Sequence, residues 1–331
     1  MDKEGYRKYL LEKKVTEEII EKFLTRLSDY QTYLEKKKQT LEDMVTNKLT
    51  EYTEYLVKTE NEATMEFIRS LYNYAYFKRR NDIIEAVIDI IESSTAMDNL
   101  YTRIAEWHGE EIRDEIFKGL TIPLVGVHPE KKPEFTKRIL KRIEEKLGEE
   151  KLIALMKPCL HEGYIMFRDI EKDRKEYQEI GIDAFLEKIT QEQIQSFEKN
   201  RDEGTPAFAQ IVDQEVVDYV RNDPISALGK REGNVIYLTK IPYQVKKLLL
   251  TNDERMKRFY ACYCPWVRGA IKNGTEKDIS KHFCECSAGW YKEFFEKLFE
   301  QPVFIEPVET ALTGVPYCKI AVHLPDNIII K

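Results

Sequence analysis

The sequence predicts an α+β fold: an N-terminal all-α helical bundle followed by an α+β domain that ends in an antiparallel sheet. The chain has 331 residues, of which 34% are charged, and it holds only 14 Gly and 12 Pro, a composition typical of helix-rich proteins. Apolar residues recur at helical spacing through the first hundred residues. Short segments rich in β-branched and aromatic residues occur in the last hundred.

Residues 14–95 are predicted to form a series of amphipathic helices. Each has apolar residues three and four positions apart, the spacing that places them on one helix face. The predicted inward-facing positions are Ile19, Ile20, Phe23, Leu24 and Leu27, then Leu49, Tyr52, Leu56 and Val57, then Met65, Ile68, Leu71, Tyr72 and Ala75, and finally Ile84, Val87, Ile88 and Ile91. The first predicted domain therefore covers residues 1–97.

A segment rich in helix-breaking residues follows. The stretch GLTIPLVGVHPEKKP contains Gly119, Pro123, Gly126, Pro129 and Pro133. We therefore expect residues 98–132 to be a linker or hinge, and residues 133–331 to form the second domain.

The second domain is predicted to combine helices with a small sheet. Residues 134–147 and 170–200 have helical patterns, and residues 287–301 form an amphipathic helix with Trp290, Phe294, Phe295 and Leu298 on one side. The segments NVIYLTKIP, PVFIEPVETAL and YCKIAVHLP are predicted strands, and TGVP between the last two is a tight turn.

Composition and charge exclude several classes of function. No apolar run approaches the roughly 18 residues that a membrane-spanning helix needs, and the charged start lacks the apolar region of a signal peptide. We therefore expect a cytoplasmic protein with no membrane partner. The net charge of −7 argues against a broad nucleic-acid surface. The chain also lacks a Gly-rich phosphate loop and a His-Glu-x-x-His metalloprotease motif.

The cysteines are concentrated late in the chain. Four of the six, Cys262, Cys264, Cys284 and Cys286, form two Cys-x-Cys pairs. They can be metal ligands, reactive thiols, disulfides or small buried residues; stable disulfides are rare in the cytoplasm. For a reactive thiol the candidates are Cys286, with His282 four residues before it, and a Cys159/His161 pair. We leave these alternatives open.

Residues 284–324 resemble the C-terminal core of the 4-vinyl reductase-like small-molecule-binding domain. The shared pattern is a Cys, a Gly and a helix, a strand with Glu, a Gly turn and a Cys in the last strand. It falls here on Cys286, Gly289, Glu309, Gly314 and Cys318. The family includes L-2-amino-thiazoline-4-carboxylic acid hydrolases and sensory domains with a structural zinc. The resemblance implies a Cys three residues after the Glu, but Leu312 stands there.

Taken with the residues themselves, this resemblance implies a zinc site. Cys318 begins a predicted strand whose partner carries Glu309, and that hairpin can lie beside the helix that starts near Cys286. Zinc prefers four ligands, and thiolates are among its best. The predicted ligands are Cys264, Cys284, Cys286 and Cys318, with Cys262 and Glu309 as substitutes.

The N-terminal helices resemble the core-binding (SAM-like) domain of tyrosine recombinases, over FLTRLSDYQTYLEKKKQTLEDMVTNKLTEYTEYLV and TMEFIRSLYNYAYFKRRN. This resemblance implies a DNA clamp, with the basic residues Lys78, Arg79 and Arg80 as its local patch. The chain has no His-x-x-Arg, and residues 1–100 hold 20 acidic and 16 basic residues. That charge balance opposes binding to phosphates.

The sequence therefore predicts a small-molecule-binding protein with a structural zinc site. The predicted ligand-binding residues are Tyr263, Trp266, Arg268 and Trp290, because aromatic rings and a guanidinium suit an aromatic or heterocyclic carboxylate. The alternatives are a hydrolase of a small cyclic C–N or C–S compound and a DNA-associated accessory protein. A homodimer is also kept open.

Overall fold

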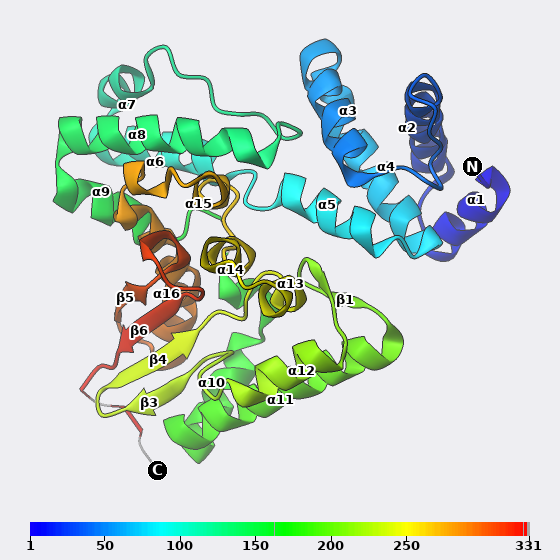
Figure 1. The fold of residues 1–331 in the computed structure, drawn as a ribbon. Helices are drawn as coiled ribbons and strands as arrows, with labels where there is room; N and C mark the ends of the chain where they lie inside the picture. Colours follow the sequence, from blue (N-terminus) through cyan, green and yellow to red (C-terminus); the bar gives the residue numbers. More distant parts are fainter. Residues whose placement is uncertain (162, 327, 330–331) are drawn as a thin grey trace. The chain divides into compact units, whose positions relative to one another are not determined.

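The computed structural model describes residues 1–331 except Glu162, Asn327, Ile330 and Lys331. The chain divides into two compact units. The first consists of Met1–Ser94 and Pro123–Lys132, and the second of Thr95–Ile122 and Pro133–Lys331. The α+β fold with a helical N-terminal region is confirmed (Figure 1).

The first unit is a helical bundle. Its helices are α1 (Lys3–Glu12), α2 (Glu17–Glu35), α3 (Thr46–Thr59), α4 (Asn61–Lys78) and α5 (Asn81–Ile91). The predicted stripes supply its core: Ile20, Leu27, Leu49, Leu71 and Val87 are all fully or almost fully buried. Burial of these stripes drives the helices together, because apolar surface removed from water stabilises the fold.

The segment Pro123–Lys132 returns to the first unit. Gly126 has φ +101°, and a Cβ added there would lie 2.8 Å from Thr64 and 2.9 Å from Val57. The Thr53 hydroxyl donates to the Gly126 carbonyl at 2.8 Å. A glycine is required here both by the backbone angle and by the close contact.

The division differs from the one predicted, because residues 98–132 are more than a linker. They include most of α6 (Ala96–His108) and all of α7 (Glu110–Phe117), whose apolar residues Leu100, Ile104 and Ile116 are buried in the core of the second unit. The stripes of these two helices are short and are separated at Gly109, which made them hard to recognise among the neighbouring breakers.

The second unit contains most of the elements. Its further helices are α8 (Lys132–Leu147), α9 (Glu149–Met156), α10 (Ile170–Ile180), α11 (Ile182–Glu203), α12 (Gln214–Asn222), α13 (Val245–Leu250), α14 (Glu254–Ala261), α15 (Arg268–Asn273) and α16 (Glu285–Phe299). A short hairpin connects α11 to α12; its strands, β1 (Pro206–Ala207) and β2 (Gln210–Ile211), have two residues each.

A four-stranded antiparallel sheet completes this unit, in the order β3 (Lys230–Glu232), β4 (Val235–Thr239), β6 (Lys319–His323) and β5 (Phe304–Glu309). Strands β4 and β6 come from distant parts of the sequence, with Ile236 opposite Val322 and Leu238 opposite Ile320. All four side chains are buried and pack with Phe294 and Phe295 of α16. Helix α16 thereby lies against the sheet (Figure 1).

None of the helices in the described part of the chain combines the length and the apolar character needed to span a bilayer.

Candidate metal centre

Two cysteines and a histidine converge in the second unit. Cys159 and His161 lie between α9 and the short 3-10 helix Tyr164–Phe167, and Cys286 is the second residue of α16. The Cys159 and Cys286 sulfurs are 3.9 Å apart, and the Cys159 Sγ lies 3.6 Å from the His161 Nδ1. One ligand atom from each of the three lies within 4.8 Å of the others, and among the described residues no other group of three such side chains does so.

These distances match those of a zinc site. With Zn–S of about 2.3 Å and Zn–N of about 2.0 Å, two ligands at a tetrahedral angle are separated by about 3.8 Å for a sulfur pair and about 3.5 Å for sulfur and nitrogen. The measured separations of 3.9 Å and 3.6 Å therefore leave room for the ion with little movement of the side chains.

Helix α6 holds the segment that carries Cys159 and His161. The Arg103 guanidinium donates to the carbonyls of Leu155 (2.6 Å), Pro158 (2.8 Å) and Cys159 (2.8 Å). One turn earlier, the Asn99 amide donates to the Leu160 carbonyl at 2.7 Å. The last carbonyls of a helix have no partners within it, so these side chains satisfy groups that α9 and the following turn leave open.

Helix α16 approaches the same segment closely at Gly289. A Cβ there would lie 2.1 Å from the Lys157 carbonyl oxygen and 2.7 Å from the Cys159 nitrogen. Gly289 and Cys286 are three residues apart and so share one helix face. The absence of a side chain at Gly289 therefore brings the Cys159 backbone against the turn that carries Cys286.

The two thiols are in hydrogen-bonding contact with each other, at 3.9 Å between the sulfurs. The Leu160 N–H donates to the Cys286 sulfur at 3.2 Å. The hydrogen bond between the two thiols lowers the pKa of Cys286. The same hydrogen bond, together with burial, raises the pKa of Cys159. The position near the start of α16 also favours a negative charge on Cys286. Cys286 is therefore the thiol of the pair that loses its proton more readily.

The other cysteines surround this group without joining it at ligand distance. Cys262 and Cys286 belong to one hydrophobic core, against which Cys159, Cys264, Cys284 and Cys318 pack. Burial raises the pKa of Cys262 to about 12. Burial, with Cys318 and Cys262 nearby, also raises the pKa of Cys284. These two thiols are therefore protonated at neutral pH.

The predicted ligand set Cys264, Cys284, Cys286 and Cys318 thus stays a prediction. Of these four cysteines, Cys286 belongs to the group that converges with Cys159 and His161. The substitute Glu309 accepts a hydrogen bond from the Tyr317 hydroxyl at 2.9 Å and stands opposite Lys319 in the sheet. His282, considered as a partner of Cys286, contacts the Glu149 carboxylate at 2.8 Å.

Two of the predicted ligand-binding residues meet around a lysine. The Lys240 ammonium lies 5.0 Å from the ring centre of Tyr263, 5.5 Å from that of Trp290 and 6.0 Å from that of Tyr291. Trp290 also lies 5.2 Å from the His161 ring, so this aromatic group adjoins the metal ligands. Lys240 was not among the predicted site residues, although it lies in the predicted strand segment NVIYLTKIP; in the structure it directly follows β4.

The other two predicted ligand-binding residues are core residues. Trp266 is 1% exposed, and its ring lies 6.2 Å from that of Phe135. Arg268 is 5% exposed, with its guanidinium 4.6 Å from the Tyr243 ring centre and 5.0 Å from that of Phe259. Arginine stacked on aromatic faces contributes packing as well as charge.

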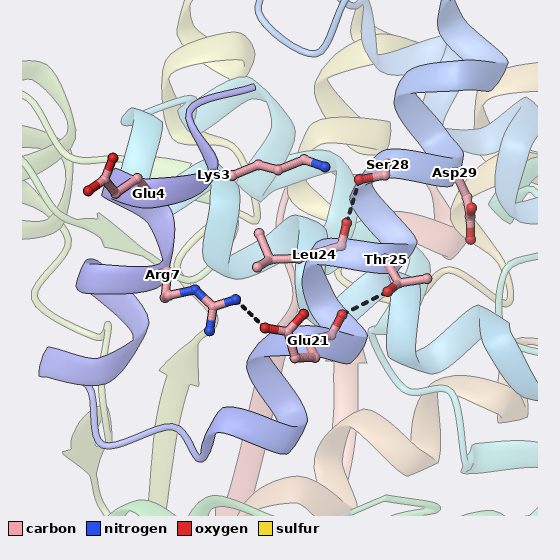
Figure 2. Close-up of a pocket in the computed structure, with 8 residues that line it drawn as sticks. All are labelled: Lys3, Glu4, Arg7, Glu21, Leu24, Thr25, Ser28 and Asp29. Atoms are coloured by element: carbon pink, nitrogen blue, oxygen red, sulfur yellow. Dashed lines mark hydrogen bonds and ion pairs between the residues drawn. The ribbon is translucent and has the colours of Figure 1, made fainter.

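Figure 2 shows a hollow of about 480 Å³ in the first unit, formed by α1 and α2. It is lined by Lys3, Glu4, Arg7, Glu21, Leu24, Thr25, Ser28 and Asp29, and contains none of the predicted ligand-binding residues. Arg7 forms an ion pair with Glu21 across it. A charged, open lining of this kind differs from the aromatic surroundings expected for an organic ligand.

The basic cluster at the end of α4 has mainly structural contacts. Arg80 donates to the carbonyls of Glu42 (2.6 Å) and Met44 (2.9 Å) and forms an ion pair with Asp82. Arg79 terminates the helix in the left-handed conformation, with φ 54°.

Comparison of the chain with protein-family models, with curated proteins and with solved structures finds no match. The function therefore has to be argued from the residues of the second unit.

Proposed function

We propose that the second unit binds a zinc ion through Cys159, His161 and Cys286. The observation that carries this proposal is the pair of distances, 3.9 Å between the sulfurs and 3.6 Å from sulfur to nitrogen, which agree with tetrahedral zinc. A thiolate–imidazole set favours zinc over magnesium or calcium, which prefer oxygen ligands. The ion would join the segment after α9 to the start of α16.

The ligand segment is supported in the manner expected of a metal site. Groups outside the ligand shell commonly orient the ligands, and their loss weakens metal binding. Arg103 and Asn99 hold the carbonyls of residues 155 and 158–160. The ligands are thus supported before any metal arrives, which lowers the ordering cost of binding.

The aromatic group beside the site supports the binding of a small organic molecule. Tyr263, Trp290 and Tyr291 surround the Lys240 ammonium, and a ligand carboxylate can pair with that cation while its ring stacks on theirs. An aromatic or heterocyclic carboxylate fits this combination.

Metal content in protein purified without tag or chelator tests the zinc site. We expect about one zinc per chain, lost in Cys159→Ser, His161→Ala and Cys286→Ser and retained in the matched controls Cys264→Ser, Cys284→Ser and Cys318→Ser. Loss in the second group with retention in His161→Ala would instead support the four-thiolate set. No metal in the unmodified chain, with six free thiols, would exclude both.

A second candidate function is hydrolysis of a small cyclic C–N or C–S compound. The observation that favours it is that three protein ligands converge among the described residues, because catalytic zinc sites keep a fourth position for water. Zinc-loaded protein would be incubated with L-2-amino-thiazoline-4-carboxylate and loss of the compound followed by chromatography. Disappearance of the compound that depends on both zinc and Lys240 would support hydrolysis. If the compound stays unchanged, the zinc site is structural rather than catalytic.

A further inference from the structure

We infer that Cys159 and Cys286 form a reversible disulfide when no metal is bound, so that metal binding and oxidation are alternative states of one site. The inference deepens the proposed function and rests on it only for the metal-bound state. The disulfide itself follows from the placement of the two thiols.

The first support is the distance between the sulfurs. They are 3.9 Å apart, and a disulfide bond is about 2.05 Å long, so the two atoms must approach by about 1.9 Å. Cys159 lies outside regular secondary structure, and its side chain is the one that we expect to rotate. Cys286 is held in α16 and is the fixed partner.

The second support is the backbone arrangement that keeps the thiols together. The Lys157 carbonyl and the Cys159 nitrogen rest against Gly289 of α16, and Arg103 fixes the Cys159 carbonyl. The pair therefore stays together in the absence of metal, although 127 positions separate the two residues in sequence.

The third support is unequal exposure, which sets the order of events. Cys159 is half-buried, whereas Cys286 is 7% exposed. The more exposed Cys159 thiol loses its proton as its sulfur attacks one sulfur of a small-molecule disulfide, which forms a mixed disulfide and releases the first small thiol. The Cys286 thiolate then attacks the Cys159 sulfur and releases the second. Both protein thiol protons end on the small thiols, so the dithiol is oxidised and the small disulfide is reduced.

Bound metal prevents disulfide formation because the metal and the disulfide require the same two sulfurs, those of Cys159 and Cys286. Mass action then sets the size of the effect: at free zinc 100 times Kd, about one chain in 100 has a free pair, and oxidation slows about 100-fold. A change of redox conditions would thereby release the metal or allow it to bind again.

The test uses the full chain stripped of metal, treated with oxidised glutathione, alkylated and mapped by peptide mass spectrometry. We expect a Cys159–Cys286 linked peptide that disappears with reduced glutathione. Cys286→Ser should accumulate glutathione on Cys159, while Cys318→Ser, a cysteine of the same core, should form the linked peptide normally. A melting curve for each variant verifies folding, and Cys159→Ser serves as a second variant if Cys286→Ser fails to fold.

The failure of this inference and the failure of the proposed function are distinguishable. Metal-free protein that binds zinc but yields no Cys159–Cys286 peptide overturns the disulfide and leaves the zinc site. Protein that binds no zinc but yields the peptide overturns the zinc site and supports the disulfide. Equal oxidation rates with and without bound zinc would contradict the claim that the two states exclude each other.

Discussion

Replacement of Gly289 by alanine tests whether the contact between α16 and the Cys159 segment is as close as the structure shows. Helix propensity alone predicts that Gly→Ala stabilises a helix by about 1 kcal/mol. The structure predicts the opposite sign, because the added Cβ would lie 2.1 Å from the Lys157 carbonyl oxygen, and real Cβ atoms essentially never approach closer than 3.0 Å. The segment must therefore move away from α16 by about 1 Å.

The magnitude follows from these two opposed effects. Forcing extra volume into a packed contact costs about 1–3 kcal/mol, and the propensity gain offsets about 1 kcal/mol of that. We expect a net loss of up to about 2 kcal/mol in the free energy of unfolding, measured by urea denaturation. We also expect weaker zinc binding, because the movement separates Cys159 from Cys286.

The matched control is the pair Glu293→Ala and Glu293→Gly on the exposed side of the same helix. There, alanine should be more stable than glycine by about 1 kcal/mol, which is the propensity difference without the contact. A Gly289→Ala variant that gains stability by that same amount and keeps its metal would refute the reasoning.

Three further changes have defined outcomes. Arg103→Met should weaken zinc affinity about 10–100-fold in a competition assay. The control Arg142→Met loses hydrogen bonds to two carbonyls outside the site and should leave zinc affinity unchanged. Equal effects of the two variants would argue against a role of Arg103 in positioning the metal ligands. Glu276→Gln should cost about 1.5–3 kcal/mol at pH 7. Burial tends to raise the pKa of Glu276, but the hydrogen bond from Arg258, a backbone hydrogen bond and the charges of Arg258 and Arg255 together outweigh burial, and the net pKa is lowered. Such a group stabilises above its unfolded pKa, so the difference in urea midpoint should close as pH falls below about 4, and a constant difference would contradict this pairing. Arg79→Gly should raise the stability of the first unit by about 0.5–1 kcal/mol in thermal unfolding, because Arg79 is exposed and has φ 54°; a loss would show that its side chain contributes more than its backbone angle costs.

Local patterns were sufficient to predict the elements that carry the site. The stripe through Trp290, Phe294 and Leu298 predicted α16. The β-branched and aromatic content of NVIYLTKIP predicted β4, and alternation in YCKIAVHLP predicted β6. These elements are confirmed. Helix α16 buries one face at the helical period, whereas β6 is buried at three consecutive residues, Ile320, Ala321 and Val322, and so is covered on both faces.

Pairings between distant segments could not be predicted in this way. Cys159 and Cys286 meet because α16 packs against the end of α9 at Gly289, and no local spacing encodes that contact. The Cys159/His161 pair and the cysteine at the start of a helix, Cys286, were predicted as separate candidates. Their convergence is a property of tertiary packing, as is the position of Lys240 among the aromatic rings.

X-ray absorption at the zinc edge tests the central claim most directly, because it counts the atoms bound to the ion. The account predicts two sulfurs at about 2.3 Å and at least one nitrogen at about 2.0 Å, with the nitrogen lost in His161→Ala. Four sulfurs and no nitrogen would contradict it and would place the ion among the thiols of Cys264, Cys284, Cys286 and Cys318.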